Sequence, residues 1–398
     1  MRSPVTAAVS VASLIPFSNL VSYLISINQE VTSDGFGFPF YVYEYYVTFN
    51  RGFVSYWGIL FNLLICAALG LGVFFLLRRP VTKHGSVLQV GFVLLSLAVG
   101  VTAQRAERTI AVTIDDLPVV VTQSDAKKRL DITRKLLAHV KKAKVPAIGF
   151  VNENKLYSDG KRNDEQIALL RMWLDAGLEL GNHTFSHRSA DAISVDEYTK
   201  DIIRGEEITK ELLTAKGMKM RYFRHPFLQT GSDMAVKTAI YKFLAEHGYT
   251  VAPITFDNAD YIFARAYDNA RDKEDADLMK RVGEAYVPYM EAKLDYWERQ
   301  SMKTLGRPMS HALLIHANSI NAEFFGDLAA MMKKRGYKFV TLEESLKDEA
   351  YRLPDNFTRR AGISWLHRWT LDKGREFVLP DEPMVPEFVL KASGFTTE

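Results

Sequence analysis

The sequence predicts an α/β fold, with parallel strands inside and helices outside them, preceded by a membrane-like N-terminal region. The first 103 residues contain only five basic and three acidic side chains, whereas the other 295 contain 45 basic and 44 acidic ones. From Arg108 onward, short apolar runs alternate with amphipathic helical patterns, as in a barrel or a doubly wound sheet. Polar clusters follow several of the apolar runs directly, at the strand ends where α/β folds build active sites.

The charge-poor region contains two long apolar runs. Residues 57–77 have Asn62 as their only strongly polar side chain, and a helix of this length spans roughly 31 Å, the hydrocarbon thickness of a bilayer. Residues 87–103 end in Val101 and Ala103, small residues at the positions that precede a signal-peptide cleavage site. We predict a membrane span for the first run and a second span or a signal peptide for the second. Residues 5–27 are apolar but diluted by serines, and whether they span stays open.

Basic residues predict the direction in which the chain crosses the membrane. Arg78, Arg79 and Lys83 follow the first span, which places this short loop in the cytoplasm. The chain from Gln104 onward is therefore expected outside the cytoplasm, in the periplasm or at the cell surface, either anchored or exported. The sequence leaves open whether the chain is cleaved after Ala103, and whether residues 1–80 belong to the natural protein.

Charge balance and cysteine content exclude several classes of protein. The charged part has no basic excess, so it carries no electrostatic footprint for nucleic acid. The one cysteine, Cys66, lies in an apolar run, which excludes an internal disulfide framework and a thiolate-rich zinc site.

The alternating layout of the charged part predicts each element in turn. Strands are expected at 109–114, 147–151, 178–180, 221–223, 249–254, 312–315 and 338–340. Helices are expected around 129–144, 165–176, 195–215, 235–247 and 324–335. A further long, charged helix at 275–301 carries four aromatic residues and is either a packing helix or a lid.

Two polar clusters contain the residue types of a catalytic metal site. Asp115 and Asp116 close the first strand, and adjacent side chains of a strand point to opposite sides, so we expect them to serve different partners. His183 and His187 are four residues apart and would share one face of a helical turn. Two imidazoles and one carboxylate leave a coordination position open for water, which is typical of a catalytic zinc site.

Three further clusters follow later strands. Arg224 stands at the end of the 221–223 strand, where its guanidinium is able to hold a carboxylate. Asp257 and Asp260 follow the 249–254 strand, and His316 follows the purely apolar run 312–315.

Taken in order, five motifs resemble those of NodB-type polysaccharide deacetylases, carbohydrate esterase family four. They are Thr-Ile-Asp-Asp at 113–116, His-Thr-Phe-Ser-His at 183–187, Phe-Arg-His-Pro-Phe at 223–227, Asp-x-x-Asp-Tyr at 257–261 and Leu-Ile-His at 314–316. The resemblance covers roughly residues 108–346. It implies a distorted (β/α) barrel with fewer than eight complete units, and metal-dependent hydrolysis of N-acetyl or O-acetyl groups on an extracytoplasmic sugar polymer.

The resemblance also implies a role for individual residues. Asp115 would be the general base, held by Arg224, and His316 the general acid, oriented by Asp260. The metal ligands would be Asp116, His183 and His187, holding Zn²⁺ or another divalent transition metal. The substrate-binding residues would be His225, Pro226, Phe227, Tyr261 and Leu314, of which Leu314 would line the pocket for the acetyl methyl group.

This chain departs from the family pattern at four positions. Ile114 and Leu117 flank the aspartate pair where phenylalanine and glycine are usual, His225 replaces a proline, and Tyr261 stands where tryptophan is usual. His225 would either bind substrate or fill the space of the proline. The altered first and third motifs suggest a second hypothesis, a related barrel that hydrolyses a small non-sugar amide or imide. A third hypothesis is a glycan-binding module without activity, in which the candidate catalytic residues would not catalyse hydrolysis.

The expected organisation is therefore a membrane and signal region at 1–103, a deacetylase-like barrel at 104–348 and a C-terminal extension at 349–398. The extension contains Trp365 and Trp369, which would either stack on sugar rings or dock the extension on the barrel.

Overall fold

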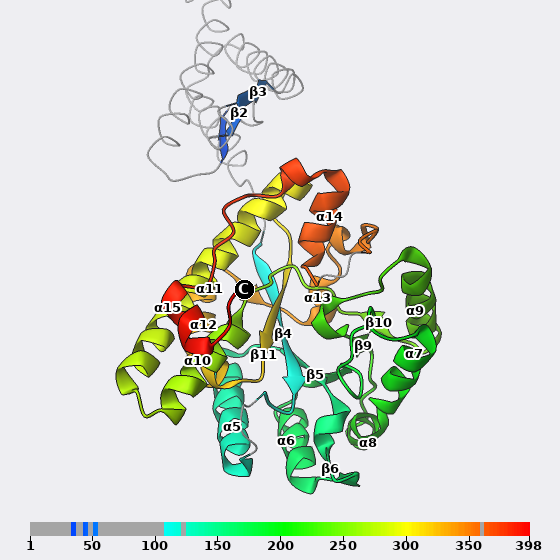
Figure 1. Ribbon diagram of the computed structural model, residues 1–398. Coiled ribbons are helices and arrows are strands. Elements are labelled where there is room, and N and C mark those ends of the chain that lie inside the picture. The colour runs from blue at the N-terminus through cyan, green and yellow to red at the C-terminus, as the bar shows by residue number, and fades with distance from the viewer. Residues whose placement is uncertain (1–32, 37–42, 47–50, 55–106, 121–124, 359–361) are drawn as a thin grey trace, which may run out of the picture. The chain divides into compact units, whose positions relative to one another are not determined.

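A curled sheet of seven parallel strands forms the centre of the unit Ala106–Glu398 (Figure 1). The strands are β4 (Thr109–Leu117), β5 (Ile148–Val151), β8 (Glu179–Asn182), β9 (Tyr222–Phe223), β10 (Thr250–Val251), β11 (His311–His316) and β12 (Lys338–Phe339). Their order is β10-β9-β8-β5-β4-β11, with β12 also paired to β4. The predicted parallel sheet is confirmed, and every predicted strand overlaps an observed one.

The computed structural model describes residues 33–36, 43–46, 51–54, 107–120, 125–358 and 362–398. The chain divides into the units Met1–Arg105 and Ala106–Glu398. In the first unit, β1 (Ser33–Phe36), β2 (Tyr43–Tyr46) and β3 (Arg51–Val54) form an antiparallel sheet. The runs 5–27, 57–77 and 87–103 lie outside the described residues. Within the part that is described, no helix has the length and apolar character needed to cross a membrane.

The sheet curls because the segment after β10 reaches its opposite edge. The amides of Thr255 and Phe256 both donate to the carbonyl of Ala312 in β11, and Leu314 donates back to Phe256. The chain between β10 and Phe256 thus joins the two edges of one sheet. The result is an incomplete barrel with the carboxyl ends of its strands at one end.

Helices surround this sheet (Figure 1). They are α5 (Ala126–Ala143), α6 (Asp164–Asp175), α7 (Val195–Arg204), α8 (Glu207–Ala215), α9 (Met234–Glu246), α10 (Asp260–Asp272), α11 (Ala276–Leu305), α12 (Ser319–Lys334), α13 (Leu342–Ser345), α14 (Trp365–Lys373) and α15 (Glu387–Ser393). Short 3-10 turns lie at Glu153–Leu156, Pro226–Leu228, Glu349–Arg352 and Arg375–Phe377, and β6 (Tyr157–Ser158) pairs with β7 (Lys161–Arg162).

The predicted helix 195–215 is two helices, which corrects the sequence interpretation. A Cβ on Gly205 would lie 2.5 Å from the carbonyl carbon of Thr184, so the chain passes this point only as glycine. The next helix then starts on a new N-terminus, where the buried carboxylate of Glu153 accepts from the amides of Ile208 and Thr209. Both features depend on residues far from this segment in sequence.

The two alternatives left open for α11 and the C-terminal extension are resolved by burial. The aromatic residues of α11 are buried, and the indole of Trp297 donates to the carbonyl of Asp257, so α11 is a packing helix. Trp365 and Trp369 are also buried in the core. They dock the extension and offer no open face to a sugar.

Candidate active site

A cavity of about 610 Å³ lies at the carboxyl ends of the strands, and nine of the twelve predicted site residues line it. These nine are Asp115, Asp116, His183, His187, His225, Phe227, Tyr261, Leu314 and His316. The other three do not line the cavity. Arg224 and Asp260 are buried and bond to lining residues, and Pro226 is buried at the start of a 3-10 turn.

Asp116, His183 and His187 form a group of metal-ligand geometry. One ligand atom from each lies within 4.8 Å of the others. The Nε2 atoms of His183 and His187 are 3.7 and 3.4 Å from Asp116 Oδ1. Burial lowers the pKa of both imidazoles, so both are neutral and able to donate a lone pair.

The tautomer of His183 also suits a metal ligand. Its Nδ1 lies 2.8 Å from the carbonyl oxygen of Arg224, which only accepts hydrogen bonds. Nδ1 therefore carries the proton, and the lone pair on Nε2 faces Asp116. Backbone carbonyls commonly orient metal-binding histidines in this way.

The donor set of this group fits a divalent transition metal. Asp116 Oδ1 is buried and accepts no hydrogen bond from any described residue. Burial alone would favour protonation, but the Lys155 ammonium outweighs it and holds the pKa of Asp116 well below its usual range. A buried, charged oxygen without a hydrogen bond, facing two neutral imidazoles, matches the nitrogen and oxygen ligands that zinc takes.

The two histidines converge from a loop, so the predicted helical turn is wrong. Thr184 and His187 have left-handed backbone angles, with φ of 65° and 53°. Side chains replace the missing helical hydrogen bonds: Thr184 Oγ1 accepts from the amide of His187, and Asn182 Oδ1 accepts from the amide of Thr184. Asp201 of α7 anchors the loop from outside by binding the amide and hydroxyl of Ser186.

The expectation that Asp115 and Asp116 point to opposite sides is also wrong. Both line the cavity, and one oxygen of each lies within 3.8 Å of the same atom, His183 Nε2. The alternation fails because Asp116 has a φ of 68° and the pairing of β4 with β5 shifts register between Ile114 and Leu117. A bulge of this kind re-aims a side chain at the end of a strand.

Asp115 is held by a buried guanidinium. Arg224 Nη1 donates to both oxygens of Asp115, at 3.2 and 3.0 Å. Its other nitrogens donate to Thr113 Oγ1 and to the carbonyl of Ala252, so Arg224 is fixed by β4 and by the residue that follows β10. Burial raises the pKa of Asp115 to about 6, against the opposing effect of Arg224. At neutral pH Asp115 is ionised yet close to accepting a proton, which suits a general base.

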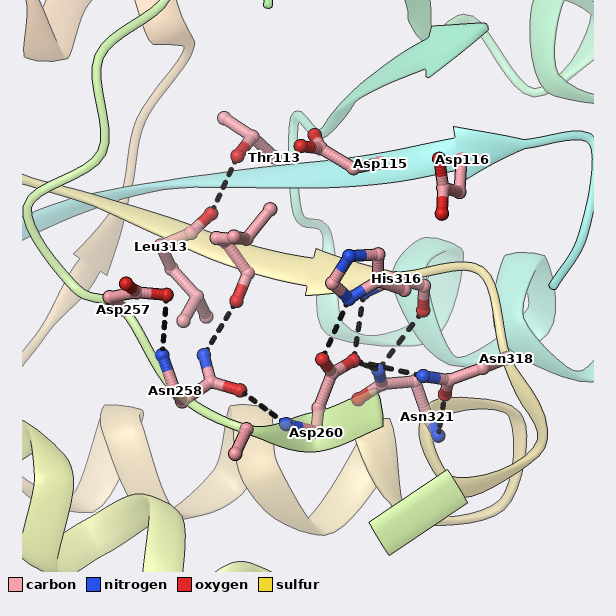
Figure 2. A network of polar contacts seen from close by, with 12 residues as sticks. Thr113, Asp115, Asp116, Asp257, Asn258, Asp260, Leu313, His316, Asn318 and Asn321 are labelled. Carbon is pink, nitrogen blue, oxygen red and sulfur yellow. Dashed lines mark hydrogen bonds and ion pairs between the residues drawn. The ribbon is translucent and has the colours of Figure 1, made fainter. Parts of the chain in front are cut away.

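Opposite Asp115, a carboxylate orients His316 (Figure 2). Asp260 Oδ1 lies 2.7 Å from His316 Nδ1, and Oδ2 accepts from the His316 amide and from the side-chain amides of Asn318 and Asn321. Burial would lower the pKa of His316, but the Asp260 carboxylate outweighs it and raises that pKa to about 9. His316 is therefore protonated at neutral pH and able to act as an acid.

These two groups predict a bell-shaped dependence of kcat/KM on pH. Activity should rise as Asp115 loses its proton near pH 6 and fall as His316 loses its proton near pH 9. A cation bound at Asp116 would lower the pKa of both Asp115 and His316, because its positive charge disfavours their protonated forms. Both limbs of the pH profile would then move to lower pH. In Asp260→Asn the alkaline limb should move further down, since the imidazolium loses its anionic partner. An alkaline limb unchanged in this variant would contradict the pairing, as measured by acetate release between pH 5 and 10.

The predicted substrate residues differ in exposure. Phe227 and Tyr261 are exposed at the cavity, at 56% and 41%, while Leu314 is buried in its wall. His225 is buried between Tyr198 and Tyr241, with ring centroids 6.1 and 5.7 Å away. Its Nδ1 lies 3.1 Å from the Tyr198 hydroxyl, so this side chain packs among aromatic residues as well as lining the cavity.

Several residues of the site were not predicted from the sequence. Asn318 and Asn321 bind Asp260, and Lys155 donates to the carbonyl of Asp116. An asparagine at the start of α12 is a helix-cap signal, so Asn318 was the member that the sequence could have indicated. Lys293, Glu382 and Glu398 also line the cavity, and they come from α11 and the C-terminal extension, where no motif marks them.

Comparisons with known proteins find one family model and several solved structures that are similar to parts of this chain. The sequence model of the polysaccharide deacetylase family matches residues 102–252. No curated protein sequence matches the chain.

Similar solved structures include a mutant of a pseudoenzyme of carbohydrate esterase family four from Bacillus anthracis, 18% identical with a TM-score of 0.41, covering 61% of this chain and 68% of that one. The peptidoglycan deacetylase PdaC from Bacillus subtilis is 21% identical with a TM-score of 0.38, covering 61% and 93%. A family 4 carbohydrate esterase from Streptomyces lividans, in complex with acetate, is 14% identical with a TM-score of 0.36, covering 60% and 95%.

Proposed function

We propose that this chain removes acetyl groups from the amino sugars of an extracytoplasmic polysaccharide, because residues 102–252 match the polysaccharide deacetylase family model. The match supports a hydrolase of carbon–nitrogen bonds other than peptide bonds. The observation that carries the proposal is one cavity lined by a base, an acid and a metal-binding group. Each of the three has the protonation state that amide hydrolysis requires at neutral pH.

In the proposed reaction, Asp116, His183 and His187 would hold a divalent cation, for which zinc fits the donor set. When bound, this cation would polarise the acyl oxygen and acidify the attacking water. Asp115 takes the proton of that water, while Arg224 keeps its carboxylate in place.

The acid side of the reaction follows from the Asp260–His316 pair. Because Asp260 binds Nδ1, the Nε2–H of the imidazolium is the group available to the substrate. His316 gives this proton to the amine nitrogen as the carbon–nitrogen bond breaks. Leu314, which lines the same cavity, would contact the acetyl methyl group.

The proposed location outside the cytoplasm rests on the sequence of the N-terminal region. Two apolar runs flank Arg78, Arg79 and Lys83, a pattern that favours export of the following domain. We propose that the catalytic unit acts in the periplasm or at the cell surface, anchored by this region or released from it.

The test is acetate release by the purified full chain from N-acetylated glycan polymers and from small amides. Release from the polymer is expected to exceed release from small amides. Release from small amides alone would favour the amidase hypothesis, and release from neither substrate in the zinc-loaded protein would favour a module without activity. Edman sequencing of the mature protein from membrane and soluble fractions shows whether the chain is cleaved after Ala103 or stays anchored in the membrane.

A further inference from the structure

The cavity has a second polar wall, apart from the base, the acid and the metal-binding group. Lys293 of α11 and Glu382 and Glu398 of the C-terminal extension line it together with the candidate catalytic residues. None of the three belongs to the five motifs. The extension therefore does more than dock on the barrel, because it supplies part of the surface that a substrate meets.

Hydrogen bonds hold this wall in place. Lys293 Nζ donates to Glu382 Oε1 at 2.8 Å and forms an ion pair with Glu398 Oε1 at 3.0 Å. Glu398 also accepts from the Tyr289 hydroxyl and from the amide of Val385. The positions of Lys293 and Glu398 are thus fixed by several partners at once.

Glu382 differs from the other two in its exposure. Its side chain is 34% exposed, against 4% for Lys293 and 15% for Glu398. Among the described residues, its one hydrogen bond is the bond to Lys293 through Oε1. An oriented carboxylate at a cavity wall, with one oxygen tied to an ammonium, presents its other oxygen as an acceptor for hydroxyl groups.

The charges of this wall are not explained by packing. Taking two carboxylates and one ammonium partly out of water costs free energy that apolar side chains of similar volume would not require. Two carboxylates around a single ammonium also leave an excess of acceptors. Such an excess suits a neutral ligand that donates several hydrogen bonds, as a sugar does with its hydroxyls.

Two exposed aromatic rings contact each other beside this wall, one from the cavity lining and one from the extension. Tyr261 lines the cavity and lies between His316, with ring centroids 6.4 Å apart, and Phe395 of the extension, with centroids 5.7 Å apart. Phe395 meets Tyr261 edge to face and is 44% exposed. Exposed aromatic faces beside oriented polar groups suit a ligand with an apolar face and a polar rim, which describes a pyranose ring.

We propose that Lys293, Glu382 and Glu398, together with Tyr261 and Phe395, form a subsite for the sugar unit next to the one that carries the acetyl group. We call these five residues the tail subsite. This inference rests on the proposed function, since it assigns a second unit of the same substrate. It makes the C-terminal extension a determinant of substrate length: a chain of sugars gains contacts there that a single acetylated sugar does not.

Two exposed residues allow the subsite to be tested without disturbing the core. Glu382→Gln and Phe395→Ala are made in the full chain, and kcat/KM for acetate release is measured on a β-linked trimer and on the monomer of N-acetylglucosamine. Each variant is expected to lose about tenfold on the trimer, the effect of one hydrogen bond to a charged group or of one aromatic contact. Activity on the monomer should stay within about twofold, because the tail subsite is empty there. Met384→Ala, in the same extension and 65% exposed, is the matched control and should change neither value.

Equilibrium binding tests the tail subsite separately from the proposed deacetylation. Calorimetric titration of the full chain with the trimer and with the monomer should show tighter trimer binding that weakens in Glu382→Gln. Equal losses on trimer and monomer, or trimer binding no tighter than monomer binding, would overturn the tail subsite. Tighter, Glu382-dependent trimer binding without acetate release would support the subsite and overturn only the proposed deacetylation.

Discussion

Replacing Asp115 by Asn is expected to lower kcat for acetate release by about 10²–10⁴-fold, the usual contribution of a positioned general base. The amide cannot take a proton from water, although it has nearly the same shape as the carboxylate. The metal-binding group uses Asp116, His183 and His187, so metal content should stay at the wild-type level. Turnover that is unchanged in this variant would remove Asp115 from the role of base.

Asparagine is the informative replacement because Arg224 lies behind Asp115. Asparagine removes the charge but keeps an amide oxygen that accepts from Arg224 Nη1, whereas alanine would leave the fully buried guanidinium with neither a charge nor an acceptor at this position. Breaking a buried ion pair in that way typically costs about 3–5 kcal/mol of stability, which would confuse lost catalysis with lost folding. The melting temperature of Asp115→Asn should therefore be compared with that of Asp196→Asn, an exposed control on α7.

Removing the metal is expected to abolish acetate release. Chelation of the purified protein should stop turnover, and added Zn²⁺ should restore it, because the buried Asp116 oxygen and the two neutral imidazoles are arranged for a cation. His187→Ala should bind metal more than about 100-fold more weakly, since even losing an indirect partner of a metal ligand costs 10–100-fold.

Metal content by elemental analysis and acetate release measured on the same samples provide the check. His247→Ala is the matched control, because His247 is an exposed histidine at the end of α9. Full activity in a chain shown to be free of metal would contradict the role of Asp116, His183 and His187.

The sequence predicted the parts of the fold that depend on local patterns. Apolar runs such as 109–114 and 312–315 are strands in the structure because their side chains are buried on both faces of the sheet. Turn residues such as Gly336 end helices because their backbone takes positive φ, which glycine adopts without strain. The same patterns predicted that the polar clusters lie at one end of the sheet, since the carboxyl ends of parallel strands share one edge.

The sequence patterns did not predict which side chains contact each other at the carboxyl end of the sheet. The aspartate pair was expected to diverge, but a left-handed Asp116 and a register shift turn both carboxylates to His183. The histidine loop was expected to be helical, but Asp201 and Thr184 hold it in another shape. In both places, hydrogen bonds with neighbouring elements overcome the local preference of the backbone.

By itself, then, the sequence determined the strand and helix order, the edge of the sheet where chemistry gathers and the residue types of a base, an acid and a metal site. Only the tertiary structure decided that Lys293 and Glu382, 89 residues apart, meet at the same cavity. Their contact arises because the extension packs on the barrel through buried residues such as Trp365 and Trp369. Contacts of this kind depend on the packing of distant segments, and hydrophobic periodicity within a short window contains no information about them.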